Sequence, residues 1–328
     1  MMLRIGMIGT GALASLMDAR LAEQADVVML GSWPEQLDAI EAHGLTLVEA
    51  DGRSQTLSLI ATDEPLLLEP VDVALVLVKS YQTGTAVRRL RTLLNTDTLI
   101  VTLQNGLGNW DTLAQAYGAW RVVQGVTSLG ATMVQPGVVR AAGDGPISLA
   151  RMAANMFFEP FVACLRAAGF SVELVHDVQG LVWGKLAVNA AINPLTAVLH
   201  VRNGLLAEEE ALCRVMMAAA RETAVAAAAQ GIQLPYPDAA ERARQVAQAT
   251  AQNQSSMLQD VQRGSQTEID AICGAIIKAG QRFAVPTPIN AQLWRWVKSV
   301  EAGQPISDWQ IAVDGVVVDL KRFRETED

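Results

Sequence analysis

Lys185, Asn189 and Asn193 recur at intervals of four residues inside an otherwise apolar stretch, residues 181–199 (LVWGKLAVNAAINPLTAVL). This spacing places the three polar side chains on one face of a helix. Burying an unpaired polar group costs roughly a few kcal/mol, so the stripe must face water or a ligand. Because the flanking residues are apolar, the pattern favours a lined cleft over a helix that exposes one polar stripe. In a cleft, desolvation would make Lys185 a better proton donor to a developing alkoxide.

Two further polar residues follow predicted strands. Lys79 lies in VKS after the run at 73–78, and Asn105 lies in QNG after the run at 99–103. Ligands of open parallel sheets bind at the carboxyl ends of the strands, so both residues are candidates for contact with a ligand. The alternatives are a solvated turn lysine and a plain Asn-Gly turn, since both residues of that turn tolerate positive φ.

A glycine-rich turn lies near the N-terminus, in RIGMIGTGALAS. Gly9, Gly11 and Ala14 form a G-x-G-x-x-A pattern between a predicted strand and a predicted helix. Gly9 permits a tight turn, Gly11 lets the backbone approach a pyrophosphate, and Ala14 allows helix and strand to pack closely. The N–H groups and the positive dipole end of the helix would face the phosphates. The pattern predicts a dinucleotide site, the alternative being a purely structural turn.

The end of the second predicted strand bears on the choice of dinucleotide. An acidic residue there favours a free ribose 2′-hydroxyl, and an arginine favours a 2′-phosphate. This chain has neither, because the strand at 27–30 is followed by Gly31, Ser32 and Trp33. The Ser32 side chain could bond a hydroxyl or a phosphate, so these residues by themselves leave the choice open.

Short apolar runs alternate with helical stretches in the first half of the chain, which predicts a doubly wound, mostly parallel sheet. The expected strands are residues 3–8, 27–30, 73–78, 99–103 and 122–126, followed by a hairpin through Gly137 and residues 143–145. Later, apolar residues recur at helical spacing in 181–199, 205–229, 239–259 and 269–283. We therefore expect an α/β dinucleotide-binding domain at 1–176 and an all-α domain at 177–328 that binds substrate and dimerises.

Composition narrows the class of protein. The formal net charge of −9 is spread without a basic stripe that could follow a phosphate backbone, so nucleic acid is not expected as a partner. Cys164, Cys213 and Cys273 stand far apart and the three histidines are scattered, so no metal site is expected. The apolar N-terminal run is broken by glycines and is shorter than the ~20 residues that span a bilayer. We expect a cytoplasmic protein without a signal peptide or a membrane segment.

Residues 253–270 (NQSSMLQDVQRGSQTEID) carry hydroxyls and carboxylates that alone could be helix caps or solvated faces. Together with GTGALAS, VKSYQ, QNGLG and GKLAVNAAINPLTA, this segment resembles the ketopantoate reductase (2-dehydropantoate 2-reductase) family over essentially the whole chain. The resemblance implies a Rossmann domain followed by an all-α domain. It also implies NADPH-dependent reduction of 2-dehydropantoate to (R)-pantoate, on the route to pantothenate and coenzyme A.

The same resemblance implies roles for individual residues. Lys185 would be the general acid that protonates the carbonyl oxygen, and Glu268 would lie near both the lysine and the cofactor. Substrate contacts would come from Asn105, Lys185, Asn189, Asn193, Asn203 and Ser256. Cofactor contacts would come from Gly9, Thr10, Gly11, Ala12, Leu13, Ala14, Ser32, Lys79, Asn105, Ala131 and Glu268.

Other functions remain open at this point. Many members of the family carry an arginine where this chain has Ser32, so the resemblance implies NADPH and the residue itself leaves NADH open. The same polar residues would also bind another small 2-keto or 2-hydroxy acid. One methylene group changes the binding free energy of a substrate by only ~1–3 kcal/mol. A non-catalytic nucleotide-binding regulator is the remaining alternative. It would need only the cofactor loop, whereas Lys185, Asn189, Ser256 and Glu268 are all present.

A first prediction concerns assembly. The alanine-rich helices of the C-terminal half carry more apolar surface than one small bundle buries, so we expect a homodimer. Light scattering at micromolar concentration should give about twice the 35.1 kDa mass of one chain. A monomer mass under these conditions would contradict the expectation.

Overall fold

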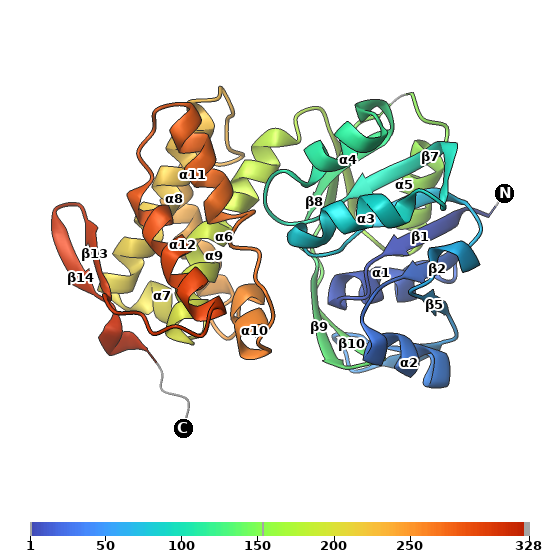
Figure 1. Ribbon diagram of the computed structural model, residues 1–328, viewed down its shortest axis with the longest axis horizontal. Coiled ribbons are helices and arrows are strands. Elements are labelled where there is room, and N and C mark those ends of the chain that lie inside the picture. The colour runs from blue at the N-terminus through green and yellow to red at the C-terminus, as the bar shows by residue number, and fades with distance from the viewer. Residues whose placement is uncertain (1, 153, 325–328) are drawn as a thin grey trace. The chain divides into compact units, whose positions relative to one another are not determined.

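The structure, a computed structural model, describes residues 2–152 and 154–324. The chain divides into two compact units, which are described separately here. The first contains Met1–Gln104 and Gly108–Val178, and the second contains Asn105–Leu107 and Gln179–Asp328. In Figure 1 the first unit runs from blue to green and the second from yellow-green to red.

An eight-stranded sheet forms the centre of the first unit, in the order β12-β11-β8-β7-β6-β1-β2-β5. All neighbouring strands are parallel except β8 and β11. The strands are β1 (Arg4–Ile8), β2 (Asp26–Leu30), β5 (Ile60–Thr62), β6 (Val71–Val76), β7 (Leu94–Thr102), β8 (Val122–Thr127), β11 (Ile147–Ala150) and β12 (Val172–Val175). Each strand predicted from an apolar run is present, with ends displaced by a few residues.

Helices cover both faces of this sheet, which is why its central strands are apolar along their whole length. One apolar core joins the sheet to α1 (Ala12–Leu21) and α5 (Phe158–Ala167). A second core joins the other face to α3 (Thr83–Leu90) and α4 (Asn109–Tyr117). The doubly wound α/β architecture predicted for this part of the chain is confirmed.

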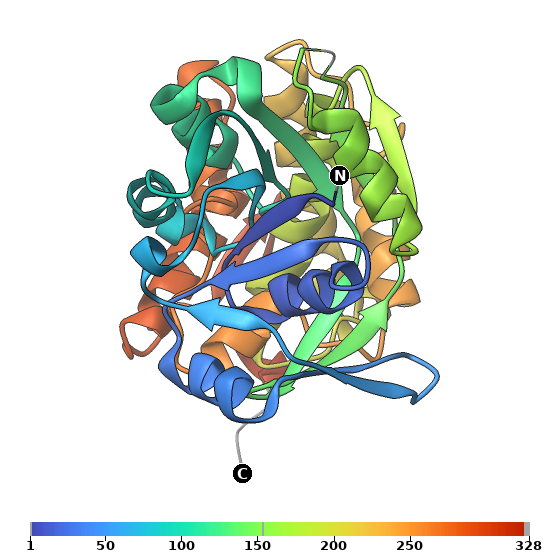
Figure 2. The same ribbon diagram turned by 90° about the vertical axis from the view of Figure 1, so that its right-hand side faces the viewer.

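A second, four-stranded sheet in this unit was predicted only in part. Its order is β4 (Ser54–Leu57), β3 (Leu45–Val48), β10 (Val138–Gly143) and β9 (Gly130–Gln135). The predicted hairpin is β9–β10, which turns at Gly137 with a φ of 78°. The β3–β4 hairpin was not predicted, and Figure 2 shows it projecting at the lower right. Helix α1 packs against strands of both sheets.

The second unit is a helical bundle. Its helices are α6 (Gln179–Leu199), α7 (Leu205–Glu208), α8 (Glu210–Ala228), α9 (Ala239–Ala249), α10 (Ser256–Gln262), α11 (Cys273–Arg282) and α12 (Pro288–Glu301). Two predicted long helices were wrong, because 205–229 is interrupted at Glu209 and 239–259 is interrupted before Ser255. The Ser255 hydroxyl accepts a hydrogen bond from the backbone N–H of Leu258, so it starts a new helix instead of continuing the old one.

The helical class of the second unit is confirmed, with one unpredicted addition near the C-terminus. Strands β13 (Gln310–Val313) and β14 (Val316–Asp319) form an antiparallel hairpin. Its Trp309, Ile311 and Val318 side chains are buried in the helical core. Among the described residues, no helix is long and apolar enough to cross a membrane. In the same ranges, no group of three or more His, Cys, Asp or Glu could hold a metal ion.

Asp18 lies on α1 and is fully buried, although aspartate is usually a charged surface residue. Its relative exposure is 0%. Neither carboxylate oxygen has a hydrogen-bond partner among residues 2–152 and 154–324. Desolvation by this burial raises the pKa of Asp18 from 3.8 to about 8. At neutral pH the folded protein therefore holds Asp18 in its protonated form.

A second prediction follows for stability. The unfolded state releases the Asp18 proton above pH 3.8 and the folded state releases it only near pH 8, so this group makes the protein progressively less stable across that window. Asp18→Asn mimics the protonated form, so its gain in Tm should grow from pH 5 to pH 8. Thermal unfolding by circular dichroism measures this gain. Asp38→Asn on an exposed position of α2 (Pro34–His43) is the control. An equal gain at both pH values would contradict the assignment.

Candidate active site

The glycine-rich turn adopts the conformation that a phosphate-binding loop requires. Gly9 has a φ of 130°, and its N–H donates to the carbonyl of Leu30 at 2.9 Å. A Cβ on Gly9 would lie 3.1 Å from the carbonyl group of Leu77, so a side chain has no room there. Gly11 is the N-cap of α1 and has no side-chain cap, and a Cβ on it would meet nothing within 4 Å. The first backbone N–H groups of this helix have no partner within the helix and no side-chain cap.

The rest of the fingerprint packs this loop onto the sheet. Ala14 is fully buried, and Ala12 and Leu13 pack against the same core. Thr10 is 6% exposed, and a Cβ on Gly31, the residue after β2, would lie 2.0 Å from its methyl group, so a side chain at position 31 would displace Thr10. The loop thus combines a narrow turn with an uncapped helix start, and these residues fit the pyrophosphate of a dinucleotide.

Other predicted cofactor residues of the first unit lie on separate elements. Ser32 is exposed directly after the end of β2. Lys79 is half-buried directly before the short helix η2 (Ser80–Gln82), and its backbone N–H donates to Gln82 Oε1. Ala131 lies on β9 in the smaller sheet, half-buried against the core that contains α1.

Gln104 contacts the segment that contains Lys79, and the sequence did not predict this contact. Its Nε2 donates to the carbonyl of Val78 at 2.8 Å and to Thr83 Oγ1 at 2.9 Å. These bonds join the end of β7 to the segment that follows β6 and so position Lys79. The sequence contains no periodic signal for a contact between residues this far apart.

The second unit brings together the lysine and the carboxylate. Lys185 is half-buried on α6, with Asn189 half-buried and Asn193 only 7% exposed on the same face. Burial lowers the pKa of Lys185 from 10.5 to about 8, and the negative charge of Glu268 opposes this shift. Glu268 is 6% exposed, and it accepts a hydrogen bond from Asn105 Nδ2 at 3.3 Å.

Asn105 reaches Glu268 because residues 105–107 pack with the helical unit. The N–H of Leu107 donates to the carbonyl of Ala271 at 3.0 Å. Gly106 has a φ of 79°, and a Cβ on it would lie 2.5 Å from that same carbonyl oxygen. Gly106 is therefore required by a close backbone approach, and the Asn-Gly pair is more than a solvated turn.

The two remaining predicted substrate residues differ in exposure. Ser256 is exposed at the first position of α10, whereas its neighbour Ser255 is buried and accepts a hydrogen bond from Thr196 Oγ1 at 2.7 Å. Asn203 is 7% exposed and donates through Nδ2 to Thr250 Oγ1. The Asn203 Oδ1 atom is buried without a hydrogen-bond partner in the described part of the chain.

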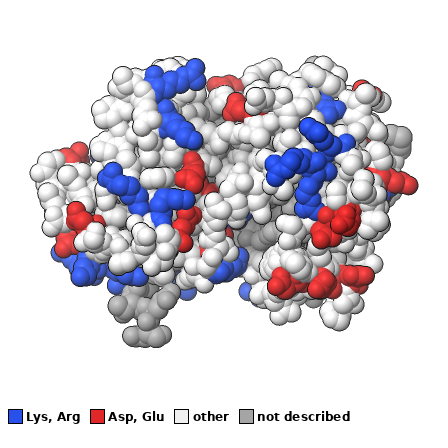
Figure 3. All heavy atoms as spheres, viewed as in Figure 1, with Lys and Arg blue, Asp and Glu red and all other residues white. Residues whose placement is uncertain are grey.

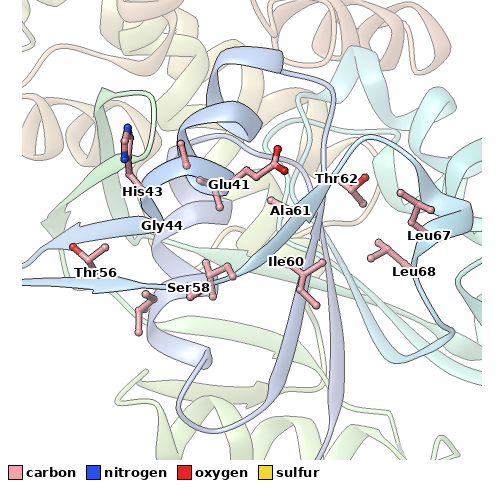
Figure 4. A pocket seen from close by; sticks show the side chains of 14 residues that line it. Glu41, His43, Gly44, Thr56, Ser58, Ile60, Ala61, Thr62, Leu67 and Leu68 are labelled. Atoms are coloured by element: carbon pink, nitrogen blue, oxygen red, sulfur yellow. The ribbon is translucent and has the colours of Figure 1, made fainter.

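A separate pocket of about 840 Å³ lies at the edge of the first unit. Figure 4 shows His43 and Thr56 toward one end of this pocket, Leu67 and Leu68 toward the other, and Glu41, Ser58 and Ile60 between them. None of the predicted site residues lines this pocket. Its position therefore adds nothing to the candidate site.

A dinucleotide loop and a lysine with a pKa close to neutrality are what an oxidoreductase needs to reduce a carbonyl group with a nicotinamide. Residues 5–154 match the family model described as "Ketopantoate reductase PanE/ApbA", and residues 177–301 match "Ketopantoate reductase PanE/ApbA C terminal". The chain belongs to the ketopantoate reductase family, whose members are nicotinamide dinucleotide-dependent oxidoreductases. The resemblance inferred from the motifs is thereby confirmed.

Individual relatives agree with this assignment. A 2-dehydropantoate 2-reductase of Archaeoglobus fulgidus is 36% identical over 92% of this chain and 98% of its own length. The crystal structure of a PanE/ApbA family ketopantoate reductase from Ralstonia eutropha is 30% identical, with a TM-score of 0.85 over 92% of this chain and 99% of that one. A D-mandelate dehydrogenase crystallised with NADH and anilino(oxo)acetate is 23% identical. It has the same TM-score of 0.85 over 92% of this chain and 99% of its own, and so shares the fold.

A third prediction tests the pairing of Lys185 with Glu268. Removing the carboxylate removes the charge that raises the lysine pKa, so Glu268→Gln should lower the pKa of Lys185 below its value of about 8. Reductive ¹³C-methylation of the lysines followed by NMR titration measures this pKa directly. Asp270→Asn is the matched control, because that exposed carboxylate pairs with Lys298. Equal titration curves for Lys185 in the wild type and in Glu268→Gln would contradict the pairing.

Proposed function

We propose that this protein reduces 2-dehydropantoate to (R)-pantoate with NADPH, as a cytoplasmic homodimer on the route to pantothenate and coenzyme A. Membership of the ketopantoate reductase family supports the reaction, and so does the name of the Archaeoglobus fulgidus relative. The observation that carries the proposal is the half-buried Lys185 on the polar face of α6, with the Glu268 carboxylate, from the segment between α10 and α11, acting on its charge.

Lys185 acts as the general acid in this proposal. Reduction of the keto group develops negative charge on its oxygen, which must be neutralised in a site of low dielectric. A lysine with a pKa of about 8 is protonated at neutral pH and yields its proton more readily than an ordinary lysine. Glu268 keeps the ammonium form populated, and Asn105 orients the carboxylate of Glu268 through its amide.

The substrate is held by the other polar groups of the second unit. Asn189 and Asn193 share the face of α6 that carries the lysine. Asn203 is the further residue that the family resemblance implies for the substrate. Ser256 can donate its hydroxyl to the substrate carboxylate. We propose that residues 177–328 form the substrate-binding and dimerisation domain and residues 1–176 the cofactor domain.

Cofactor binding is proposed for the first unit and its neighbouring segments. The turn from Gly9 to Ala14 would hold the pyrophosphate with its backbone N–H groups. When bound, the nicotinamide supplies the hydride to the keto carbon. Ser32, Lys79, Asn105, Ala131 and Glu268 are the further residues proposed to contact the dinucleotide.

The substrate is tested with a small panel of 2-keto acids. Purified protein with NADPH or NADH should oxidise the reduced nicotinamide fastest with 2-dehydropantoate, compared with 2-oxoisovalerate and benzoylformate. A higher kcat/KM on benzoylformate would replace the proposed substrate by an aromatic keto acid, and the assignment as a reductase would stand.

A fourth prediction concerns the acid. Lys185→Ala should lower kcat by roughly 10² to 10⁴, the range for loss of a positioned proton donor, while the Kd of the cofactor changes little. Stopped-flow turnover and cofactor fluorescence measure the two quantities. Lys278→Ala on an exposed position of α11 is the control. Near-normal turnover of Lys185→Ala would transfer the acid role to Lys79 or to water.

A further inference from the structure

Arg89 places a guanidinium at the strand ends where the adenosine ribose of a dinucleotide binds. Its Nη2 donates to the backbone carbonyl of Gly31 at 2.8 Å and also to the carbonyl of Asp63. Gly31 directly follows β2, and its own N–H donates to the carbonyl of Thr62 at the end of β5. The guanidinium therefore lies at the carboxyl ends of two neighbouring strands, the first of which sets the 2′ preference in dinucleotide-binding sheets.

The guanidinium comes from a helix and not from the strand end itself. Arg89 is in the last turn of α3, and it is half-buried. Figure 3 shows basic side chains gathered over this part of the first unit, where α3 carries Arg88 and Arg89 and is followed by Arg91. The chain thus presents a positive charge beside Ser32, although Ser32 itself is uncharged.

The hydrogen bonds of Arg89 leave its charge available to a ligand. Both of its bonds to protein within the described ranges use Nη2. The other two donors, Nη1 and Nε, make none of these bonds and are not fully buried. An incoming oxyanion can therefore reach them. Asp63 contacts the guanidinium through its backbone carbonyl, and its carboxylate does not neutralise it. A planar guanidinium with free N–H groups matches the geometry of a phosphate dianion.

We infer that Arg89 binds the ribose 2′-phosphate of NADPH and supplies the discrimination against NADH that Ser32 cannot supply alone. The two carbonyl contacts hold the guanidinium in place before the cofactor arrives, and the exposed Ser32 hydroxyl completes the phosphate site. This inference rests on the proposed function, and it assigns a cofactor-specificity residue outside the glycine loop and outside the end of β2.

Binding measurements test the inference without turnover. The Kd values of NADPH and NADH, and of adenosine 2′,5′-bisphosphate and AMP as probes of the adenosine half, are measured by calorimetry at fixed ionic strength. Arg89→Ala should weaken NADPH and adenosine 2′,5′-bisphosphate by roughly 10- to 100-fold, the usual loss for a hydrogen-bonded charge pair. NADH and AMP should change by less than about 3-fold, because they lack the phosphate.

Matched variants separate this role from a structural one. Arg88→Ala removes the same charge from the neighbouring position, whose guanidinium bonds Thr85 on its own helix, and should leave the ratio of the two Kd values unchanged. Arg89→Gln keeps a donor for the carbonyls if Arg89→Ala does not fold, and it should show the same selective loss for NADPH. Equal weakening of NADPH and NADH in the Arg89 variants would make Arg89 a structural residue and overturn the inference.

The wild type separates failure of the inference from failure of the proposed function. If the wild type binds NADPH no better than NADH, the inference is wrong, and a reductase using either cofactor remains. If it binds neither cofactor, the proposed function fails as well.

Discussion

The electrostatic interaction of Lys185 with Glu268 is the one on which the proposed chemistry of this protein depends. Burial alone would favour a neutral lysine, and a neutral amine has no proton to give. The Glu268 carboxylate opposes this effect and leaves the pKa of Lys185 at about 8. The amide of Asn105 donates to this carboxylate, and the backbone around Gly106 approaches Ala271 so closely that no side chain fits. Segment 105–107 therefore supports the lysine although it follows a strand of the first unit.

In the first unit, the conformation of the glycine-rich turn depends on how little space there is for side chains around it. The turn at Gly9 leaves no room for a side chain beside Leu77, and Thr10 fills the position where Gly31 would carry one. Helix α1 packs against strands of both sheets, so its start cannot move without disturbing both. This packing includes a buried Asp18 without a hydrogen-bond partner in the described chain. The helix that follows the glycine-rich turn is thus packed on two sides, and its buried Asp18 carboxyl is protonated at neutral pH.

Cofactor choice illustrates how a parallel sheet can use residues from several elements for one ligand group. The carboxyl ends of β2 and β5 lie side by side, and a guanidinium from α3 reaches the backbone of both. We propose that this placement takes the role that an arginine directly after β2 would otherwise have. In this proposal the positive charge beside the ribose comes from Arg89 on α3, and position 32 can be a serine.

The sequence by itself determined the elements with a strong hydrophobic period and the motifs that lie on them. Runs such as 73–78 are apolar because both faces of the sheet are covered, and the polar stripe on 181–199 is periodic because one face of α6 differs from the rest. Local sequence patterns also predicted the glycine fingerprint and the order of the two folds along the chain. They carried the resemblance to ketopantoate reductases as well. The roles assigned to the site residues remain predictions.

Tertiary structure decided what depends on contacts between distant residues. Strand β4 is polar and mostly exposed, so it has no alternating pattern to reveal it. The start of α10 is set by the Ser255 cap, which the hydrophobic period does not report. Arg89 bonds carbonyls 58 and 26 residues away, and backbone carbonyls carry no sequence signature. Asp18 looks like a solvated charge in the sequence, and only the packing of two sheets around α1 makes it a buried acid.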